Sequence, residues 1–221
     1  MKQYDVFIFD ADNTLYDYDM AEAAALRALL DNCRIEYNED IRARYREICK
    51  EEPDTTRFPR FLAELGVAAI NAADFNDYYL KLLSSKPYLI DGALKICRDI
   101  TAAGGKIYIA TDGAAATLAR LAAGSLQKYI SDVFIAEEIG HEMLHPEFFA
   151  HILRRVRPAT KDKMLMIGDN PALDIACGKH AGIDTCWLNR FGEKNITGIV
   201  PTYEIRRLHQ LADAIPKGGR T

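Results

Sequence analysis

Residues 4–17 read YDVFIFDADNTLYD, and they carry the clearest structural signal in the sequence. Val6 to Phe9 form a short apolar run of β-branched and aromatic residues, which is typical of a strand buried on both faces of a parallel sheet. The run ends at two carboxylates, Asp10 and Asp12, with one residue between them. Because ligands bind outside the carboxyl ends of the strands in open α/β sheets, we expect this pair to face a ligand crevice.

The close pair of carboxylates has two interpretations. Two acidic side chains in one place repel each other unless a cation or a shared proton relieves the repulsion, so the pair indicates a metal site or an acid/base pair. The alternative is a solvated turn after a strand, because Asp and Asn favour turns. The choice between them depends on the rest of the chain.

The composition is that of an ordinary globular protein. The chain has 221 residues, of which 49% are hydrophobic and 27% charged, and its formal net charge of −4 gives no indication of nucleic-acid or anionic-membrane binding. The five cysteines are scattered and include no Cys-x-x-Cys pair, which suits a reducing cytosol better than a disulfide framework or a zinc site. We find no signal-peptide pattern and no apolar run of the roughly 20 residues that a membrane span needs. We therefore expect a soluble, cytoplasmic protein.

The segment after the acidic pair is expected to be helical. Apolar residues recur at helical spacing in four consecutive segments, with strong helix formers in the first and an asparagine that can cap the second. These segments are residues 20–30, 38–50, 58–65 and 75–83. No strand pattern interrupts them, so we predict that residues 18–86 form a helical cap domain. Residues 1–17 and 87–221 would then form the core domain.

From Pro87 onward, strand and helix patterns alternate, which is typical of a parallel sheet with crossover helices. The expected strands of this part are residues 106–110, 133–136, 164–167, 185–188 and 202–205. The predicted fold class is α/β, with a Rossmann-like doubly wound parallel sheet as the core and an inserted α-helical bundle as the cap.

Polar side chains follow three of the expected strands. Asp10 and Asp12 follow the first, Thr111 and Asp112 the second, and Asp169 the fourth, with Asp174 five residues further on. Each group taken singly can be explained as a turn or a helix cap. In a doubly wound sheet, however, the first strand lies centrally and the crevice opens beside it, so the three groups are expected to meet at one site.

These same residues resemble a known family. Residues 10–15 (DADNTL), Thr111 and the pattern Gly168-Asp169-x4-Asp174 resemble the first, second and fourth motifs of the haloacid dehalogenase superfamily of phosphohydrolases. The helical insert follows the first motif, where many members carry a cap. Residues 185–189 (TCWLN) resemble a segment of the nucleotidase-like branch.

The resemblance implies a covalent mechanism. Asp10 would be the nucleophile that forms an aspartyl-phosphate, and Asp12 the general acid and then the general base. The metal site would consist of Asp10, the Asp12 carbonyl and Asp169, with Asp174 as a supporting or water-mediated ligand. Because all these ligands are oxygens, they favour Mg²⁺ over zinc.

The resemblance also implies a phosphate-binding site after the second strand. Thr111 and the backbone N–H groups of Asp112 and Gly113, which precede a helix, would hold the phosphate oxygens. Related sequences usually have Asn where this chain has Asp112. A carboxylate beside a phosphate would repel it unless the side chain points away or contacts the metal.

The third motif of the family, a lysine, is missing from residues 137–149. Three interpretations are open. His145 substitutes as a phosphate-binding cation; or His145 is an ordinary residue near a helix start and another group or a second chain supplies the charge; or the enzyme has lost most of its turnover. Lys163 begins the fourth strand, roughly 20 Å from the far end of that strand, and cannot reach the site.

We therefore predict a Mg²⁺-dependent phosphatase that acts through an aspartyl-phosphate on a small phosphorylated metabolite, with a nucleoside monophosphate as the first choice. The alternative is a catalytically impaired member of the family that binds a phosphorylated ligand or a protein partner. We expect neither nucleic acid nor membrane as a partner, and a monomer or a homodimer. A receiver domain of a signalling protein and a dehalogenase fit the sequence less well.

Overall fold

The computed structural model describes residues 1–52, 54–67, 70–113, 115–156 and 160–216. The chain divides into two compact units. One consists of Met1–Asp17 with Pro87–Thr221, and the other of Tyr18–Lys86. Within the described ranges, no helix is long and apolar enough to cross a membrane.

The first unit, which we call the core unit, is built on a six-stranded sheet in which every neighbouring pair is parallel. Its strands are β1 (Val6–Phe9), β2 (Lys106–Thr111), β3 (Ile130–Ile135), β4 (Met164–Gly168), β5 (Asp184–Leu188) and β6 (Tyr203–Ile205). They follow the order β3-β2-β1-β4-β5-β6, so β1 is central and its neighbours are β2 and β4. This confirms the predicted fold class. It also places the ends of these three strands side by side.

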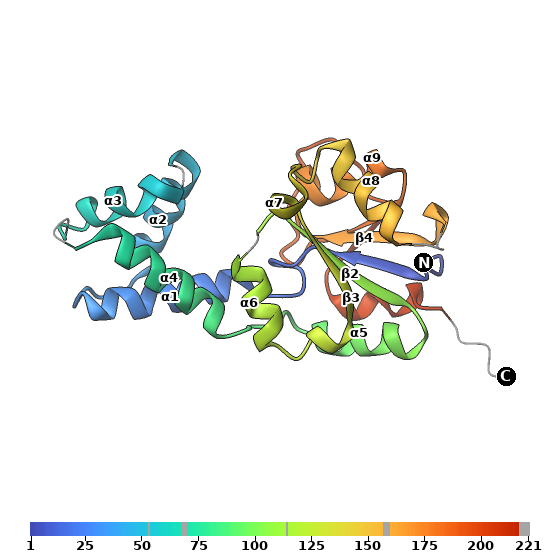
Figure 1. Cartoon of the computed structure of the whole chain (residues 1–221), viewed down its shortest axis with the longest axis horizontal. Helices are drawn as coiled ribbons and strands as arrows, with labels where there is room; N and C mark the ends of the chain where they lie inside the picture. Colours follow the sequence, from blue (N-terminus) through green and yellow to red (C-terminus); the bar gives the residue numbers. More distant parts are fainter. Residues whose placement is uncertain (53, 68–69, 114, 157–159, 217–221) are drawn as a thin grey trace. The chain divides into compact units, whose positions relative to one another are not determined.

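Helices cover both faces of the sheet (Figure 1). The helices of the core unit are α5 (Ala93–Ala102), α6 (Ala115–Ala123), α7 (Ala136–Ile139), α8 (Pro146–Arg155) and α9 (Ala176–Ala181), joined by the short 3₁₀ segments η1 (Gln127–Tyr129), η2 (Lys161–Lys163) and η4 (Leu208–Ala214) and by the π-helical segment η3 (Pro171–Ile175). On one face lie α8 and α9, and α5 lies on the other (Figure 1).

The apolar run of β1 explains this layering. Successive side chains of a strand point to opposite faces. Phe7 and Phe9 accordingly belong to a buried cluster with residues of α5 and η4, whereas Val6 and Ile8 belong to a second buried cluster with residues of α8 and α9. All four side chains are at most 2% exposed. A strand buried on both faces is therefore confirmed.

Among the strands, the largest difference from the predicted bounds lies at β3. The sequence pattern predicts a strand over residues 133–136, but β3 begins at Ile130 and Ala136 already starts α7. Ile130 pairs with Ile107 of β2, while the polar Ser131 and Asp132 lie in the same strand. Because β3 is an edge strand, polar residues can occur in it without leaving buried groups unpaired.

In its described residues, the second unit contains four helices, α1 (Tyr18–Asn32), α2 (Glu39–Glu51), α3 (Asp54–Glu64) and α4 (Ala72–Ser85). Its centre is an aromatic cluster whose ring centroids lie 5.2–5.9 Å apart. The cluster consists of Tyr45, Phe58, Phe61, Phe75 and Tyr79. Asn38 caps α2 by accepting the backbone N–H of Ile41 at 2.9 Å, as the sequence predicts.

Candidate active site

The site is built on the turn that follows β1. The backbone N–H of Asp10 donates to the carbonyl of Ile167 at 2.8 Å, which joins the end of β1 to β4. The chain then turns tightly, because the N–H groups of Leu15 and Tyr16 both donate to the carbonyl of Ala11. Asn13 has a φ of 56°, which asparagine tolerates better than most residues. The turn keeps Asp10 and Asp12 at the carboxyl edge of the sheet.

A pocket of about 290 Å³ opens at this edge, and we call it the acidic pocket. It is lined by Asp10, Asp12, Asn13, Thr111, Asp112, Gly113, Asp169, Asn170, Leu173 and Asp174. Seven of the eight site residues predicted from the sequence are among them, and they come from the ends of β1, β2 and β4. Only His145 is missing from the described lining.

Three carboxylates of the acidic pocket form a cluster suited to a metal ion. Asp10, Asp169 and Asp174 each offer an oxygen, and these oxygens lie within 4.8 Å of one another. Asp174 is 1% exposed; one of its oxygens accepts the N–H of Asn170 at 2.9 Å, and the other, Oδ1, is buried with no hydrogen-bond partner. A buried carboxylate oxygen without a donor is costly unless a cation binds it. The oxygen-only donor set fits Mg²⁺.

The raised pKa values of the clustered carboxyls show that their ionised forms are unfavourable without a cation nearby. Burial raises the pKa of Asp10 well above its usual range, and the neighbouring carboxylates Asp174, Asp169 and Asp12 raise it further. Burial is also the main cause that raises the pKa of Asp174. A divalent cation would remove this repulsion and keep the carboxylates ionised.

Asp12 has a cationic partner that the sequence interpretation missed. Arg120, on α6, donates to Asp12 Oδ1 at 2.5 Å and is only 1% exposed. Burial raises the pKa of Asp12, and Arg120 opposes that rise. One signal was present in the sequence, since Arg120 is the only charged residue between Gly113 and Gly124. The sequence does not show that this arginine is buried, and only its burial implies an ionic partner.

The end of β2 supplies the hydroxyl and the backbone groups expected for phosphate binding. Thr111 is 3% exposed, and its Oγ1 accepts the N–H of Gly113 at 3.4 Å. The carboxylate of Asp112 accepts the N–H of Met143. Desolvation raises the pKa of Asp112, and the charge of Glu142 adds to the rise.

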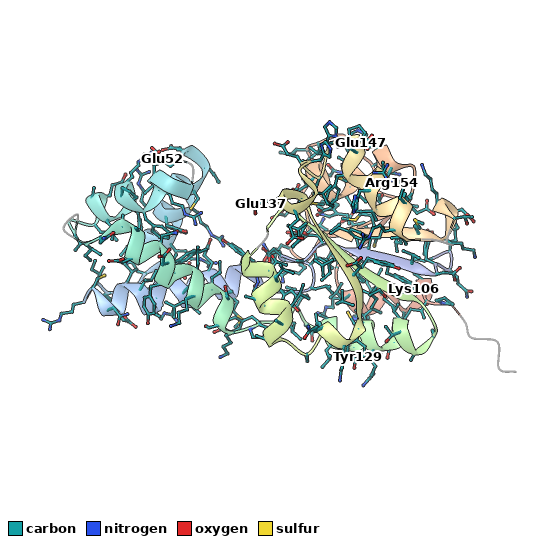
Figure 2. The ribbon with its side chains drawn as sticks, viewed as in Figure 1. Glu52, Lys106, Tyr129, Glu137, Glu147 and Arg154 are labelled. Atoms are coloured by element: carbon teal, nitrogen blue, oxygen red, sulfur yellow. The ribbon has the colours of Figure 1, made fainter. Side chains whose placement is uncertain are left out.

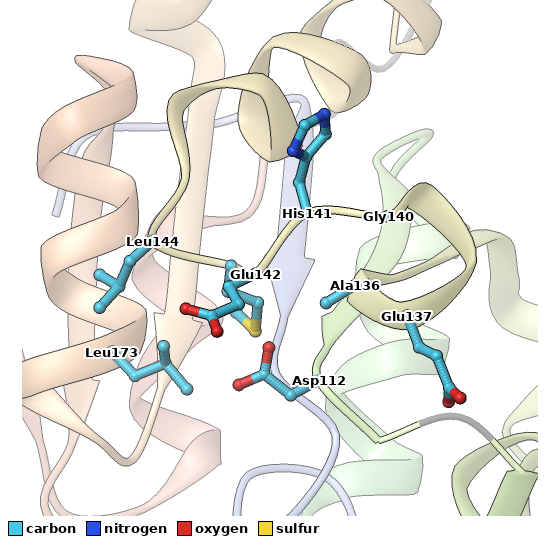
Figure 3. A pocket seen from close by; sticks show the side chains of 9 residues that line it. Asp112, Ala136, Glu137, Gly140, His141, Glu142, Leu144 and Leu173 are labelled. Carbon is cyan, nitrogen blue, oxygen red and sulfur yellow. The ribbon is translucent and has the colours of Figure 1, made fainter.

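Asp112 also lines a second pocket of about 440 Å³, which lies beside the acidic pocket and shares Leu173 with it. In Figure 3 the carboxylates of Asp112 and Glu142 lie close together, while His141 points away from them. The second pocket therefore adds negative charge beside the acidic pocket. The described residues that line either pocket include no lysine or arginine.

His145 lies outside the acidic pocket. It is exposed and caps α8, where its Nδ1 accepts the N–H of Glu147 at 3.2 Å, and its ring stacks on His141 at 4.4 Å between centroids. Figure 2 labels Glu147 and Arg154, two exposed residues of the same helix. Its position does not support the predicted role of His145 in phosphate binding.

The segment after the fourth motif, residues 185–189, includes a side chain that stabilises the backbone of the acidic pocket. Trp187 of β5 is 3% exposed, and its indole Nε1–H donates to the carbonyl of Asp169 at 2.8 Å. This contact fixes the backbone from which the Asp169 side chain projects. It gives a physical role to Trp187, which lies within residues 185–189, a segment that the sequence interpretation noted only as a resemblance.

Comparison with known proteins agrees with this geometry. The model of the haloacid dehalogenase-like hydrolase family matches residues 4–182. The chain is 33% identical to YfnB of Bacillus subtilis, which is named as a HAD hydrolase, over 96% of this chain and 95% of YfnB. It is 31% identical to the pyrimidine 5'-nucleotidase PynA of Streptococcus pneumoniae (97% of this chain, 96% of PynA) and 27% identical to the pyrimidine 5'-nucleotidase YjjG of Escherichia coli (97% and 99%).

A solved structure of YfnB, described as bound to magnesium, has a TM-score of 0.87 with this chain at 32% identity, and covers 96% of this chain and 98% of its own. The family match spans most of the sequence and includes the strands that carry the acidic pocket. The chain therefore belongs to the haloacid dehalogenase-like hydrolase family, in its nucleotidase-like branch, and is a phosphatase of that family.

Proposed function

We propose that the chain hydrolyses small phosphomonoesters in a Mg²⁺-dependent reaction that passes through an aspartyl-phosphate on Asp10. The observation that carries this proposal is the acidic pocket itself. It gathers Asp10 and Asp12 from β1, Thr111 from β2, and Asp169 with Asp174 from the end of β4. These are the residue types that a covalent phosphoryl transfer with a hard cation requires.

In the proposed reaction, a carboxylate oxygen of Asp10 attacks phosphorus while the bond between phosphorus and the ester oxygen breaks. Asp12 donates its proton to the departing oxygen, and then takes a proton from the water that hydrolyses the aspartyl-phosphate. Thr111 and the N–H groups of Asp112 and Gly113 would hold the phosphate oxygens. Mg²⁺, held by Asp10, Asp169 and the Asp12 carbonyl with support from Asp174, would supply positive charge that offsets the negative charge of nucleophile and phosphate.

For the substrate, we propose a nucleoside monophosphate. Two relatives that match nearly the whole chain are named pyrimidine 5'-nucleotidases, which supports this class above sugar phosphates.

We also propose that residues 18–86 form the family's cap domain and select the substrate. A cytoplasmic location is proposed as well, and it is consistent with five free cysteines. The expected oligomeric state is a monomer or a homodimer.

Phosphate release tests the proposal. The wild-type chain and Asp10→Asn would be assayed on pyrimidine and purine nucleoside monophosphates and on sugar phosphates, with Mg²⁺ and with a chelator. We expect turnover that requires Mg²⁺ and is lost in Asp10→Asn. Turnover that survives in Asp10→Asn, or that does not need a metal, would exclude the aspartyl-phosphate mechanism.

One observation favours the alternative of a binding protein with little turnover. The described residues that line the acidic pocket include five aspartates and no lysine, arginine or histidine. Calorimetry with Mg²⁺ and a nucleoside monophosphate separates the two functions. Binding of both ligands without phosphate release would establish the binding protein, whereas release at a steady rate would exclude it.

A further inference from the structure

We propose that Arg120 is a positioning residue that holds the Asp12 carboxyl in the orientation from which it protonates the leaving oxygen. The proposal rests on the function proposed above and deepens it. Sequence interpretation assigned no role to Arg120.

The contact geometry of Arg120 supports a fixed orientation. One terminal nitrogen of its guanidinium donates both to Asp12 Oδ1 at 2.5 Å and to Thr117 Oγ1 at 3.1 Å, one turn earlier on α6. The guanidinium carbon lies 5.9 Å from the centroid of the Tyr16 ring. Arg120 and Thr117 are each 1% exposed. The cation is therefore held by α6 and by the turn after β1, and it cannot swing into solvent.

The close approach of α6 is supported by its last residues. A Cβ on Gly124 would lie 2.9 Å from the Arg120 carbonyl and 3.3 Å from the Tyr16 hydroxyl. A glycine at this place lets the end of α6 pack against the turn that carries Asp12. The sequence thus brings the helix, its arginine and the Asp12 turn together in one unit of the structure.

Arg120 does not line the acidic pocket, whereas Asp12 does. Arg120 therefore acts on the reaction through Asp12 rather than on the substrate. With Oδ1 bound to the guanidinium, Oδ2 is the oxygen left to carry the transferred proton. In the step concerned, the bond from Asp10 to phosphorus forms, the ester bond breaks with its electron pair on the leaving oxygen, and the proton passes from Asp12 to that oxygen. The carboxylate left on Asp12 is then stabilised by Arg120.

Leaving groups of different quality separate this role from a merely structural one. A nucleoside monophosphate loses an alkoxide, which needs the proton, but p-nitrophenyl phosphate loses a stable phenolate, which hardly needs it. We expect Arg120→Met to lower kcat/KM on the nucleoside monophosphate by about 30-fold or more, and kcat/KM on p-nitrophenyl phosphate by no more than about 3-fold. The ratio kcat/KM reports the steps up to departure of the leaving group, so the later hydrolysis of the aspartyl-phosphate, in which Asp12 acts on both substrates, does not enter it. Arg120→Lys should recover part of the loss. In an Asp12→Asn background, Arg120→Met should have almost no further effect, because the two residues act as one unit.

Leu121→Ala serves as the matched control, since Leu121 is also buried on α6 but belongs to the apolar cluster. It should change both rates by the same factor. Equal losses on both substrates in Arg120→Met, or a loss that adds to that of Asp12→Asn, would overturn the proposal. If Arg120→Met does not fold, as judged by the absence of cooperative thermal unfolding, Arg120→Lys and Thr117→Val take its place. Each should then lose more activity on the nucleoside monophosphate than on p-nitrophenyl phosphate. A wild-type chain that hydrolyses neither substrate with Mg²⁺ would instead refute the proposed function.

Discussion

At the scale of single residues, the position of Asp174 depends on a glycine. Gly168 ends β4, and a Cβ built on it would lie 2.1 Å from Asp174 Oδ2. The carboxylate thus occupies the space that any other residue would fill. The loop after β4 can bring the Asp174 carboxylate into the acidic pocket only because residue 168 has no side chain.

Gly168→Ala should therefore displace Asp174 and weaken Mg²⁺ binding by about tenfold or more. Calorimetric titration with Mg²⁺ measures the affinity directly. The matched control is Gly104→Ala, which places a side chain at a φ of +83° but with no atom within 4 Å of the new Cβ. The control should lose stability through backbone strain and keep its Mg²⁺ affinity. Equal affinities in both variants would contradict the role given to Gly168.

Asp10→Asn should remove turnover and yet stabilise the metal-free chain. Burial and three neighbouring carboxylates raise the pKa of Asp10, so its ionised form is unfavourable in the folded state. A neutral amide of similar size removes that repulsion, and we expect about 1 kcal/mol or more of added stability near neutral pH. Urea unfolding in the presence of a chelator measures it. A destabilised Asp10→Asn would show that the acidic pocket is not under electrostatic strain.

The residues that sequence interpretation identified and those it missed differ in a physical way. Asp10, Asp12 and Asp169 follow strands directly, so strand prediction alone places them at one edge. Arg120 lies in the middle of a helix, and its contact with Asp12 depends on how α6 packs. His145 precedes a proline, where both a cap and a site residue are plausible, and only its hydrogen bond to Glu147 decides between them.

At the scale of elements, apolar strands were predictable and irregular segments were not. β1 and β4 are buried throughout and β2 and β5 beyond their first residue, and the predicted ranges of all four differ from the observed ones by no more than one residue at either end. The start of β3 contains polar residues that only its pairing with β2 explains. The π-helical turn η3 (Pro171–Ile175), which carries Asp174, has no periodic sequence signal, because its geometry follows from the contact of Asp174 with Asn170.

The cap of α8 gives a prediction at this scale. His145→Ala removes the acceptor of the Glu147 N–H and should destabilise the chain by about 0.5–1 kcal/mol. Turnover should stay the same, because His145 does not line the acidic pocket. Asn38→Ala, which removes the cap of α2, is the control and should show a similar loss of stability. A rise in KM confined to His145→Ala would restore the phosphate-binding role that the sequence suggested.

At the scale of the whole molecule, the strand order concentrates charge. The chain carries a formal net charge of only −4, but the acidic pocket alone holds five aspartates from three separate segments. The order β2-β1-β4 brings these segments together, and the burial of Asp174 with the partial burial of Asp10, Asp12 and Asp169 limits screening by water. Local negative charge of this density, and not the net charge, determines how the chain responds to protons and to Mg²⁺.

Stability should therefore depend on pH more strongly without the metal than with it. The raised pKa values of Asp10 and Asp174 mean that the metal-free folded state holds protons that the unfolded state has released. The contribution of these two groups to stability should be fully present below about pH 4, and should fall as the pH rises toward their raised pKa values. Mg²⁺ binds the ionised carboxylates, so its affinity and the stabilisation that it provides should increase over the same range.

Thermal unfolding from about pH 5 to about pH 8, with Mg²⁺ or with a chelator, tests this linkage. The melting temperature with the chelator should fall with pH, and the gap between the two curves should widen. Asp10→Asn is the matched variant, because it removes one of the carboxylates with a raised pKa and one metal ligand. Its two curves should lie closer together and depend less on pH. A constant gap in the wild-type chain would mean that Mg²⁺ binds away from the buried carboxylates.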